Sequence, residues 1–337
     1  MPASQRTILV IHPGGLGDVL LSVGALTALR TAFPQHRIIL LAGSGVGDLL
    51  GLCGVIDQSL PMESSQLNAL FSGRAQISDM QHDLLRHCDL AVGWLSDHDG
   101  SIRRTLGELG IPRVILQSPS STEGSHQSER FIQTLQGEFP VGALPSIHLH
   151  LPDQVLRAGI DALHTAGIEQ GAPLIACHPG SGSRHKCVRA DTWGALLRGC
   201  RARQFTPVVV LGPADDQAGE ALQAQDISEV PILRPASIAL LAAILAQAQG
   251  YIGHDSGVTH LAALLGVPTV AMFGPTDEQR WAPLGVQVTV VRGERCACAN
   301  WDAVQACTEK SCLNITADEV FKALDADDFR YHRVTNS

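Results

Sequence analysis

The sequence predicts an α/β protein built from two doubly wound parallel sheets, and three observations support this fold class. Short β-branched runs alternate with helical patterns along the chain, which is typical of parallel sheets covered by helices. A non-periodic stretch from Val141 to Pro152 interrupts the series, which starts again near Pro173. Turn residues follow four of the expected strands. We expect a first domain over residues 1–152 and a second over residues 153–337, whose last helix is a candidate to pack back on the first domain.

The individual elements follow from local pattern. Apolar residues at positions 19, 23, 26, 29 and 33 mark one face of a helix from Val19 to Phe33, and Pro34 ends it. A second helix is expected from Val258 to Gly266. The strands expected in the first half are Ile8–Ile11, Ile38–Leu41, Leu90–Trp94 and Val114–Leu116. Those expected in the second half are Leu174–Cys177, Val208–Leu211, Tyr251–Ile252 and Thr269–Phe273.

Composition restricts the class of protein. With 337 residues, of which 45% are hydrophobic and 17% charged, the chain is long enough for two packed domains and too apolar to be disordered. Its apolar runs stop short of the roughly 20 residues that cross a bilayer, and its start lacks the features of a secretory signal. We expect a cytoplasmic protein. The formal charge of −9 argues against a nucleic-acid partner.

The turns after the strands are candidate phosphate sites. Glycines allow a close backbone approach, and the free amides at a helix start attract anions. Lys186 follows one of these turns closely enough to add a cation, so that a diphosphate could be held between that turn and the one at Ser256. A purely structural interpretation stays open, in which Asp255 or Ser256 caps the next helix and Asp18 complements a helix dipole. The four turns are His12–Asp18, His178–Ser183, Gly212–Asp216 and His254–Gly257.

Several common site types do not fit these turns. The first turn lacks the third glycine of a dinucleotide fingerprint, and no Gly-Lys-Ser/Thr sequence marks a Walker loop. His254, Asp255 and Ser256 are adjacent on one turn and cannot form a hydrolase triad. The histidines near the turns show no His-Glu-x-x-His spacing for a metal hydrolase.

At these turns the chain resembles glycosyltransferase family 9, the ADP-heptose:lipopolysaccharide heptosyltransferases of bacteria. One difference is Cys187-Val188 after Lys186, where relatives commonly carry Trp-Pro. The resemblance is specific in the second half and thinner between Gly43 and Val141. The matching blocks are Gly17–Leu21, His178–Gly182 with Lys186, Leu211–Pro213 with Asp216, and Asp255–Gly257 with His260, continuing through Gly266–Pro268 to Phe273–Asp277.

The resemblance implies a GT-B fold, in which two Rossmann-like domains face each other across a cleft, and inverting, metal-independent transfer of a heptose from ADP-heptose to a lipopolysaccharide core. The implied partners are the nucleotide-sugar donor and a lipid-linked or lipopolysaccharide acceptor at the inner face of the inner membrane. No cofactor is implied. By position, Asp18 is the general base, Ser181, Gly182 and Lys186 hold the diphosphate, Asp216 lies near the nucleotide ribose, and Asp255, Ser256, Gly257 and His260 line the diphosphate and sugar.

Two other functions stay open. The chain could be a nucleotide-sugar epimerase or hydrolase that shares the GT-B fold, or a non-catalytic module that binds a nucleotide sugar. The sequence distinguishes neither the acceptor nor a first from a second heptose addition.

A compact set of four cysteines lies near the C-terminus, at Cys296, Cys298, Cys307 and Cys312. Four thiolates at such spacing could hold a structural Zn or Fe ion, and no position would remain open for catalysis. Reduced thiols, or disulfides formed on isolation, are the alternative interpretations of this set.

Overall fold

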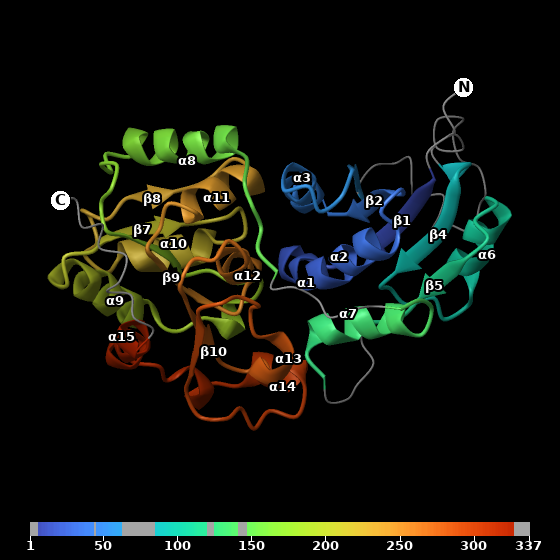
Figure 1. Ribbon diagram of the computed structural model, residues 1–337. Helices are drawn as coiled ribbons and strands as arrows, with labels where there is room; N and C mark the ends of the chain where they lie inside the picture. The colour runs from blue at the N-terminus through green and yellow to red at the C-terminus, as the bar shows by residue number, and fades with distance from the viewer. Residues whose placement is uncertain (1–5, 44, 63–84, 120–124, 141–146, 327–337) are drawn as a thin grey trace. The chain divides into compact units, whose positions relative to one another are not determined.

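The computed structural model describes residues 6–43, 45–62, 85–119, 125–140 and 147–326. The chain divides into two compact units, residues 1–145 and residues 146–337. Each unit contains one parallel sheet with helices packed on it (Figure 1). None of the described helices is long and apolar enough to span a membrane.

The first unit has a five-stranded sheet of order β3-β2-β1-β4-β5, all parallel. On the central strand β1, Leu9 and Ile11 pack in a core with Ile102 and Leu106 of α6. Because side chains alternate along a strand, Ile8, Val10 and His12 point to the opposite face. The elements are β1 (Thr7–His12), α1 (Leu16–Leu21), α2 (Val23–Ala32), β2 (Arg37–Ala42), α3 (Val46–Leu52), β3 (Gln58–Pro61), β4 (Cys88–Gly93), α6 (Ser101–Glu108), β5 (Val114–Leu116) and α7 (Gln127–Gln136).

The second unit has a six-stranded parallel sheet of order β8-β7-β6-β9-β10-β11. Its helices and strands are α8 (Asp153–Thr165), β6 (Leu174–His178), α9 (Ala190–Ala202), β7 (Thr206–Val210), α10 (Asp216–Gln223), β8 (Ile232–Leu233), α11 (Ile238–Leu245), β9 (Gly250–His254), α12 (Gly257–Leu264), β10 (Thr269–Phe273), α13 (Glu278–Trp281), β11 (Val288–Arg292), α14 (Trp301–Ala306) and α15 (Ala317–Ala326). Two 3-10 turns, η1 (Arg184–Lys186) and η2 (Ser311–Leu313), complete it.

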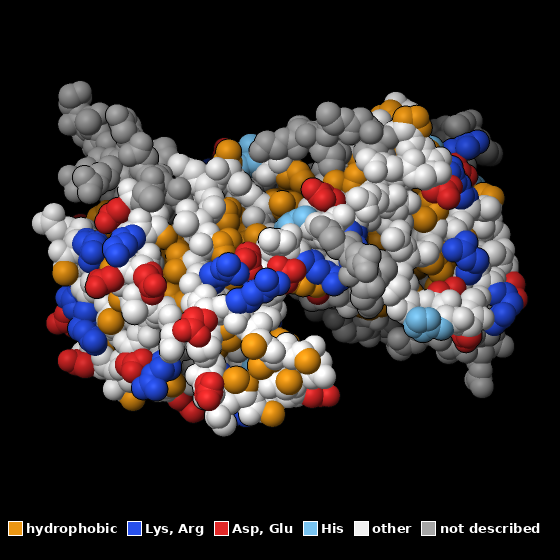
Figure 2. All heavy atoms as spheres, turned by 90° about the horizontal axis from the view of Figure 1, so that it is seen from below, with side chains coloured by type: hydrophobic (Ala, Val, Ile, Leu, Met, Phe, Trp, Pro, Cys, Tyr) orange, Lys and Arg blue, Asp and Glu red, His pale blue; other side chains and the backbone are white. Residues whose placement is uncertain are grey.

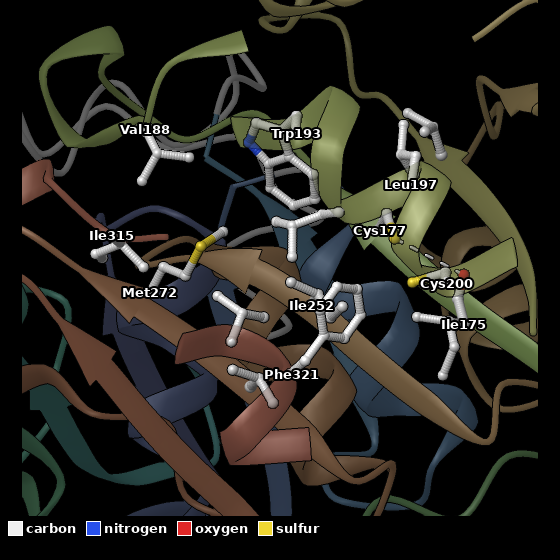
Figure 3. Close-up of a cluster of buried hydrophobic side chains, with 14 of the residues drawn as sticks. Ile175, Cys177, Val188, Trp193, Leu197, Cys200, Ile252, Met272, Ile315 and Phe321 are labelled. Carbon is white, nitrogen blue, oxygen red and sulfur yellow. Dashed lines mark hydrogen bonds between the residues drawn. The ribbon is translucent and has the colours of Figure 1, made fainter. Parts of the chain in front are cut away.

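The core of the second unit lies between its sheet and helices α9 and α15. Trp193 of α9, Ile252 of β9 and Phe321 of α15 belong to one buried cluster (Figure 3). The described last helix, α15, therefore packs on its own unit, whereas residues 327–337 lie outside the described part. On the face of this unit drawn in Figure 2, basic and acidic side chains lie side by side instead of gathering by sign.

The helix expected from Val19 to Phe33 is two helices. Helix α1 ends at Leu21 and α2 begins at Val23. At the break, the buried Ser22 hydroxyl donates to the Val19 carbonyl oxygen at 2.7 Å, a local bond of the kind that competes with regular helix hydrogen bonding. The prediction of one continuous helix was wrong for this reason.

Candidate active site

The donor-side turns meet where the strand order of the second sheet reverses. Strands β6 and β9 are hydrogen-bonded neighbours, and the chain leaves them in opposite directions, toward β7 and toward β10. Ligands of doubly wound sheets bind at the carboxyl ends of strands at such a switch point. The turn after His178 and the turn after His254 therefore share one edge, as the sequence predicts.

An ion pair connects the two turns. The Lys186 ammonium nitrogen Nζ donates to Oδ2 of Asp255 at 2.7 Å. The Asp255 side chain is 8% exposed and that of Lys186 is 23% exposed. The hydroxyl of Ser181 donates to the Asp255 carbonyl oxygen at 2.8 Å. Asp255 is thus in direct contact with two predicted donor residues that lie 69 and 74 positions earlier in the sequence.

The His254 side chain, at the end of β9, holds the segment that follows β6. Its Nε2 accepts the Val188 amide at 2.9 Å, and its Nδ1 lies 3.3 Å from the Gly180 carbonyl oxygen. An accepting Nε2 places the ring proton on Nδ1, where it can donate to Gly180. Burial is the main cause that lowers the pKa of His254 to about 3, so the ring is neutral and serves as a structural bridge.

The start of helix α12 confirms the capping role expected of Ser256. Its side chain accepts the Thr259 amide at 3.4 Å. The Thr259 hydroxyl, itself bonded to the His254 carbonyl oxygen and to Tyr251, lies 3.1 Å from the Ser256 hydroxyl. Capping does not exclude a ligand, because the helix keeps other free amides and its positive dipole end at this point.

His260 lies in the same helix, four residues after the cap. Its side chain is 5% exposed, and Nε2 is 3.9 Å from Oδ1 of Asp255. At this separation, which is too long for a hydrogen bond, the ring lies beside the carboxylate oxygen that Lys186 does not contact. Asp255 therefore lies between the two predicted donor residues.

A hollow of about 410 Å³ lies beside the turn after β6. Asp215, Gln217 and Ala218 line one side of it, and Val188 and Trp193 line another. Asp216, which the sequence predicts near a ribose, is absent from the lining; its side chain is 72% exposed and pairs with Arg234 at 2.9 Å. Its neighbour Asp215 is buried and accepts the Gly212 amide at 2.6 Å.

Sequence reasoning missed three residues of this region. Asp215 and Trp193 line the hollow. Lys310 lies near enough to affect the pKa values of two side chains next to Lys186. Burial is the main cause that lowers the pKa of His185, and the charge of Lys310 adds to it. Burial raises the pKa of Cys187 to about 11, and the charge of Lys310 acts against this rise. The helical spacing of the apolar residues of α9 could have placed Trp193 in the core. No local signal in the sequence selects Asp215 over Asp216 or indicates that Lys310 lies near this turn.

In the first unit, Asp18 occupies the first turn of α1 at the carboxyl end of β1. Its Oδ2 accepts the Gly15 amide at 3.1 Å, and the side chain is half-buried. This is the helix-start contact of the structural interpretation. A carboxylate offers about four lone-pair sites, so the bond from Gly15 is compatible with a further role.

The four C-terminal cysteines are close neighbours. The pKa of the Cys298 thiol is raised to about 11, mainly by a hydrogen bond with Cys296, with smaller contributions from burial and from Cys307. The pKa of Cys307 is lowered, mainly by a hydrogen bond from the Lys310 amide. The Lys310 amide donates to the Cys307 sulfur at 3.5 Å. Within the described part of the chain, no three or more His, Cys, Asp or Glu side chains are arranged to hold a metal ion. A metal at this cluster stays a prediction.

Comparison with known proteins identifies the family. The model of glycosyltransferase family 9 (heptosyltransferase) matches residues 144–311, which contain all of the residues that the sequence predicts for the donor. Lipopolysaccharide heptosyltransferase 1 of Pseudomonas aeruginosa is 24% identical over 340 residues, covering 94% of this chain and 90% of that protein. The chain belongs to glycosyltransferase family 9.

Solved structures agree with this family assignment on the fold. A family 9 glycosyltransferase from Veillonella parvula superposes with a TM-score of 0.79 at 17% identity, covering 97% of this chain and 98% of that one. The ADP-heptose lipopolysaccharide heptosyltransferase II of Escherichia coli gives a TM-score of 0.73 at 20% identity, covering 95% and 98%. The predicted fold class is confirmed, and this family 9 member is a glycosyltransferase.

Proposed function

We propose that the protein transfers a heptose from ADP-heptose to a lipopolysaccharide core acceptor, with inversion at the sugar and without a catalytic metal. The contact between Lys186 and Asp255 carries this proposal, because it places a cation beside two strand-end turns at the switch point of the second sheet. The names of the relatives, heptosyltransferases that act in lipopolysaccharide synthesis, support the choice of sugar and acceptor.

The donor side is proposed to stabilise the leaving group. As the bond from the sugar to ADP breaks, negative charge develops on the β-phosphate, and fixed dipoles stabilise such charge most effectively. Backbone amides at Gly182 and Gly257 and the Lys186 ammonium provide donors there. The hydroxyls of Ser181 and Ser256 would donate to the phosphate in exchange for their present partners, the Asp255 carbonyl oxygen and Thr259. Lys186 would exchange one oxygen of Asp255 for a phosphate oxygen, while His260 lies at the other oxygen.

The acceptor side needs a proton acceptor. A sugar hydroxyl is a poor nucleophile, so a carboxylate within hydrogen-bonding reach must take its proton during attack. We assign this role to Asp18, which is half-buried at the strand-end edge of the first sheet. Asp216 remains our prediction for the nucleotide ribose, and its buried neighbour Asp215 is the second candidate because it lines the hollow.

The chain supplies a matched control for Asp18. Both α1 and α3 start with the pattern Gly-x-Gly-Asp, and Asp48 takes the same third helical position in α3 that Asp18 takes in α1. Asp18→Asn should abolish sugar transfer and leave ADP binding nearly unchanged, whereas Asp48→Asn should retain transfer. If both variants lose transfer equally, a helix-start effect explains the loss and the assignment of a base is wrong.

The alternative functions are separated by one incubation. With ADP-heptose and no acceptor, an epimerase or hydrolase would convert the donor to an altered or free sugar, while a transferase would leave it essentially intact. With a lipopolysaccharide core acceptor, the proposed enzyme releases ADP, and a non-catalytic binding module forms no product. We propose that the acceptor is met at the inner face of the inner membrane.

A further inference from the structure

A histidine that the proposed function does not use lies at the end of β1. His12 is 2% exposed. Its ring centroid is 5.6 Å from that of Trp94, which follows β4, and 5.2 Å from that of Phe131 on α7. Trp94 is held in turn by its indole nitrogen, which donates to the Thr134 hydroxyl at 3.3 Å. The imidazole is thus clamped between two aromatic rings directly under the turn that leads to α1.

The two ring nitrogens of His12 have different surroundings. Nδ1 accepts the Gly14 amide at 3.2 Å. Nε2 is buried and has no hydrogen-bond partner among the described residues. Burial lowers the pKa of His12 to about 4, although the backbone of His12 and of Asp18 acts in the opposite direction. The ring is therefore neutral at physiological pH, and because Nδ1 accepts, its proton must lie on Nε2.

A buried N–H without an acceptor disfavours folding, and a hydrophobic side chain of similar size would avoid that penalty. Something that a phenylalanine or leucine could not supply must explain the histidine. A phenylalanine or leucine cannot accept the Gly14 amide, as Nδ1 of His12 does at 3.2 Å.

That contact leads directly to Asp18. A Cβ on Gly14 would lie 2.8 Å from Cε1 of His12 and 2.6 Å from Cβ of Asp18, so the glycine backbone fills the narrow space between these two side chains. The next amide along the chain, that of Gly15, donates to Oδ2 of Asp18 at 3.1 Å. Two successive amides of one turn thus bind the imidazole and the carboxylate.

We propose that His12 is a positioning residue for Asp18: by accepting the Gly14 amide, it holds the turn whose next amide orients the Asp18 carboxylate. The inference rests on the proposed function, in which Asp18 is the base. Precise placement matters, since a displacement of about 1 Å at a reacting group can cost a factor of about 100 in rate. His12 itself stays beneath the turn and does not touch the substrate.

The test compares two substitutions with opposite properties. His12→Phe fills the space between Trp94 and Phe131 and removes the acceptor, whereas His12→Asn supplies an oxygen near the Nδ1 position and leaves a packing defect. We expect His12→Phe to lower kcat about tenfold or more, a loss typical of misplaced catalytic groups, with the donor KM and the ADP affinity changed less than about twofold. His12→Asn should regain most of kcat even though its thermal stability is the lower of the two.

Packing controls make the result decisive. Trp94→Phe weakens the aromatic clamp without touching the Gly14 bond, and it should lower the melting temperature while kcat stays within about twofold of wild type. Gly14→Ala, whose methyl group would overlap both His12 and Asp18, should lower kcat as His12→Phe does. If the His12→Phe variant does not fold, Gly14→Ala takes its place as the test.

Three outcomes would overturn the inference. Unchanged kcat in His12→Phe would do so, as would equal losses in His12→Phe and His12→Asn, or a loss in Trp94→Phe as large as that in His12→Phe. Asp18→Asn, measured in parallel, separates the two levels of the proposal. If Asp18→Asn abolishes transfer while His12→Phe is fully active, the positioning role alone is wrong. If Asp18→Asn retains turnover, the base assignment is wrong and the role of His12 is wrong with it.

Discussion

Lys186 and Asp255 form an ion pair of 2.7 Å between residues that are 69 positions apart in the chain. The pair joins the turn after β6 to the turn after β9, and Asp255 is the more deeply buried partner. A cation held against a carboxylate is already placed and oriented before any ligand arrives. A diphosphate then has to compete for it with one oxygen of Asp255.

Replacing Lys186 by Met should weaken ADP binding by about tenfold or more, because a charge-assisted hydrogen bond contributes roughly 1.5–3 kcal/mol. It should also lower the melting temperature, since Asp255 would keep its burial and lose its cation. Calorimetric titration with ADP and thermal unfolding check the two effects. Lys322→Met, on the exposed side of α15, is the matched control and should change neither. Full ADP affinity in Lys186→Met would contradict the donor-side assignment.

Two glycines of one turn should respond differently to alanine. A Cβ on Gly180 would overlap the buried Asp215 carboxylate, whereas nothing lies within 4 Å of a Cβ on Gly182. We expect Gly180→Ala to destabilise the protein by about 1–3 kcal/mol through overpacking. Gly182→Ala should retain the stability of the wild type and lose affinity for ADP, if the phosphate approaches this backbone closely. Denaturant unfolding and ADP titration of both variants provide the comparison, and equal stabilities of the two would refute the packing argument.

The neutral His254 predicts a loss of stability in acid. Its folded-state pKa of about 3 lies below the ordinary value of 6.5, so the unfolded chain binds more protons between these two values and stability falls as pH falls through that window. Between pH 7 and pH 5 the loss from this one residue is about 2 kcal/mol.

Urea unfolding of wild type and of His254→Gln at the two pH values tests this number. The variant should lose about 2 kcal/mol less than wild type on acidification, even though it is less stable at both pH values. His150→Gln, which removes an exposed histidine, is the control substitution. A pH dependence that is identical in wild type and His254→Gln would show that the ring takes up its proton over the same pH range in the folded and unfolded states, which would contradict a lowered pKa.

Removal of metal should leave sugar transfer within about twofold of its original rate, because the proposed leaving-group stabilisation relies on Lys186 and fixed dipoles. Dialysis against a strong chelator, with turnover measured before and after, is the experiment. Elemental analysis of the same samples, with Cys298→Ser alongside, also reveals whether the cysteine cluster carried Zn or Fe. Loss of transfer that returns with a divalent cation would contradict the metal-independent mechanism.

Much of the fold follows from the sequence because the central strands are continuous apolar runs. The runs at Ile8–Ile11 and Thr269–Phe273 lie within strands β1 and β10. The strands that were missed, β3, β8 and β11, are edge strands and are mostly half-buried. Strand β3 contains polar residues and β8 is only two residues long, so neither shows the pattern by which a strand is identified. Strand β11 (Val288–Arg292) contains three valines and a threonine, so its sequence does carry a strand signal.

Only those parts of the candidate site that depend on residues close together in the sequence could be predicted. The glycine-rich turns and Lys186 indicate a phosphate site, and the strand order brings the turns to one edge of the sheet. The choice between Asp215 and Asp216 is different, since it depends on which carboxylate turns back to the Gly212 amide and which one points to Arg234. The partner of Lys186 likewise depends on tertiary packing, which no spacing in the sequence encodes.

The bridge made by His254 has a consequence for protein engineering. The imidazole of His254 connects the backbone at Gly180 to the backbone at Val188, and it lies on β9, outside the segment that contains both residues. The segment from 179 to 188 could be replaced by that of another enzyme in order to change the accepted nucleotide. The backbone of the new segment would then be fitted to the other enzyme's residue at the position of His254, and not to His254 itself. Such chimeras should succeed only when position 254 is transplanted together with the segment.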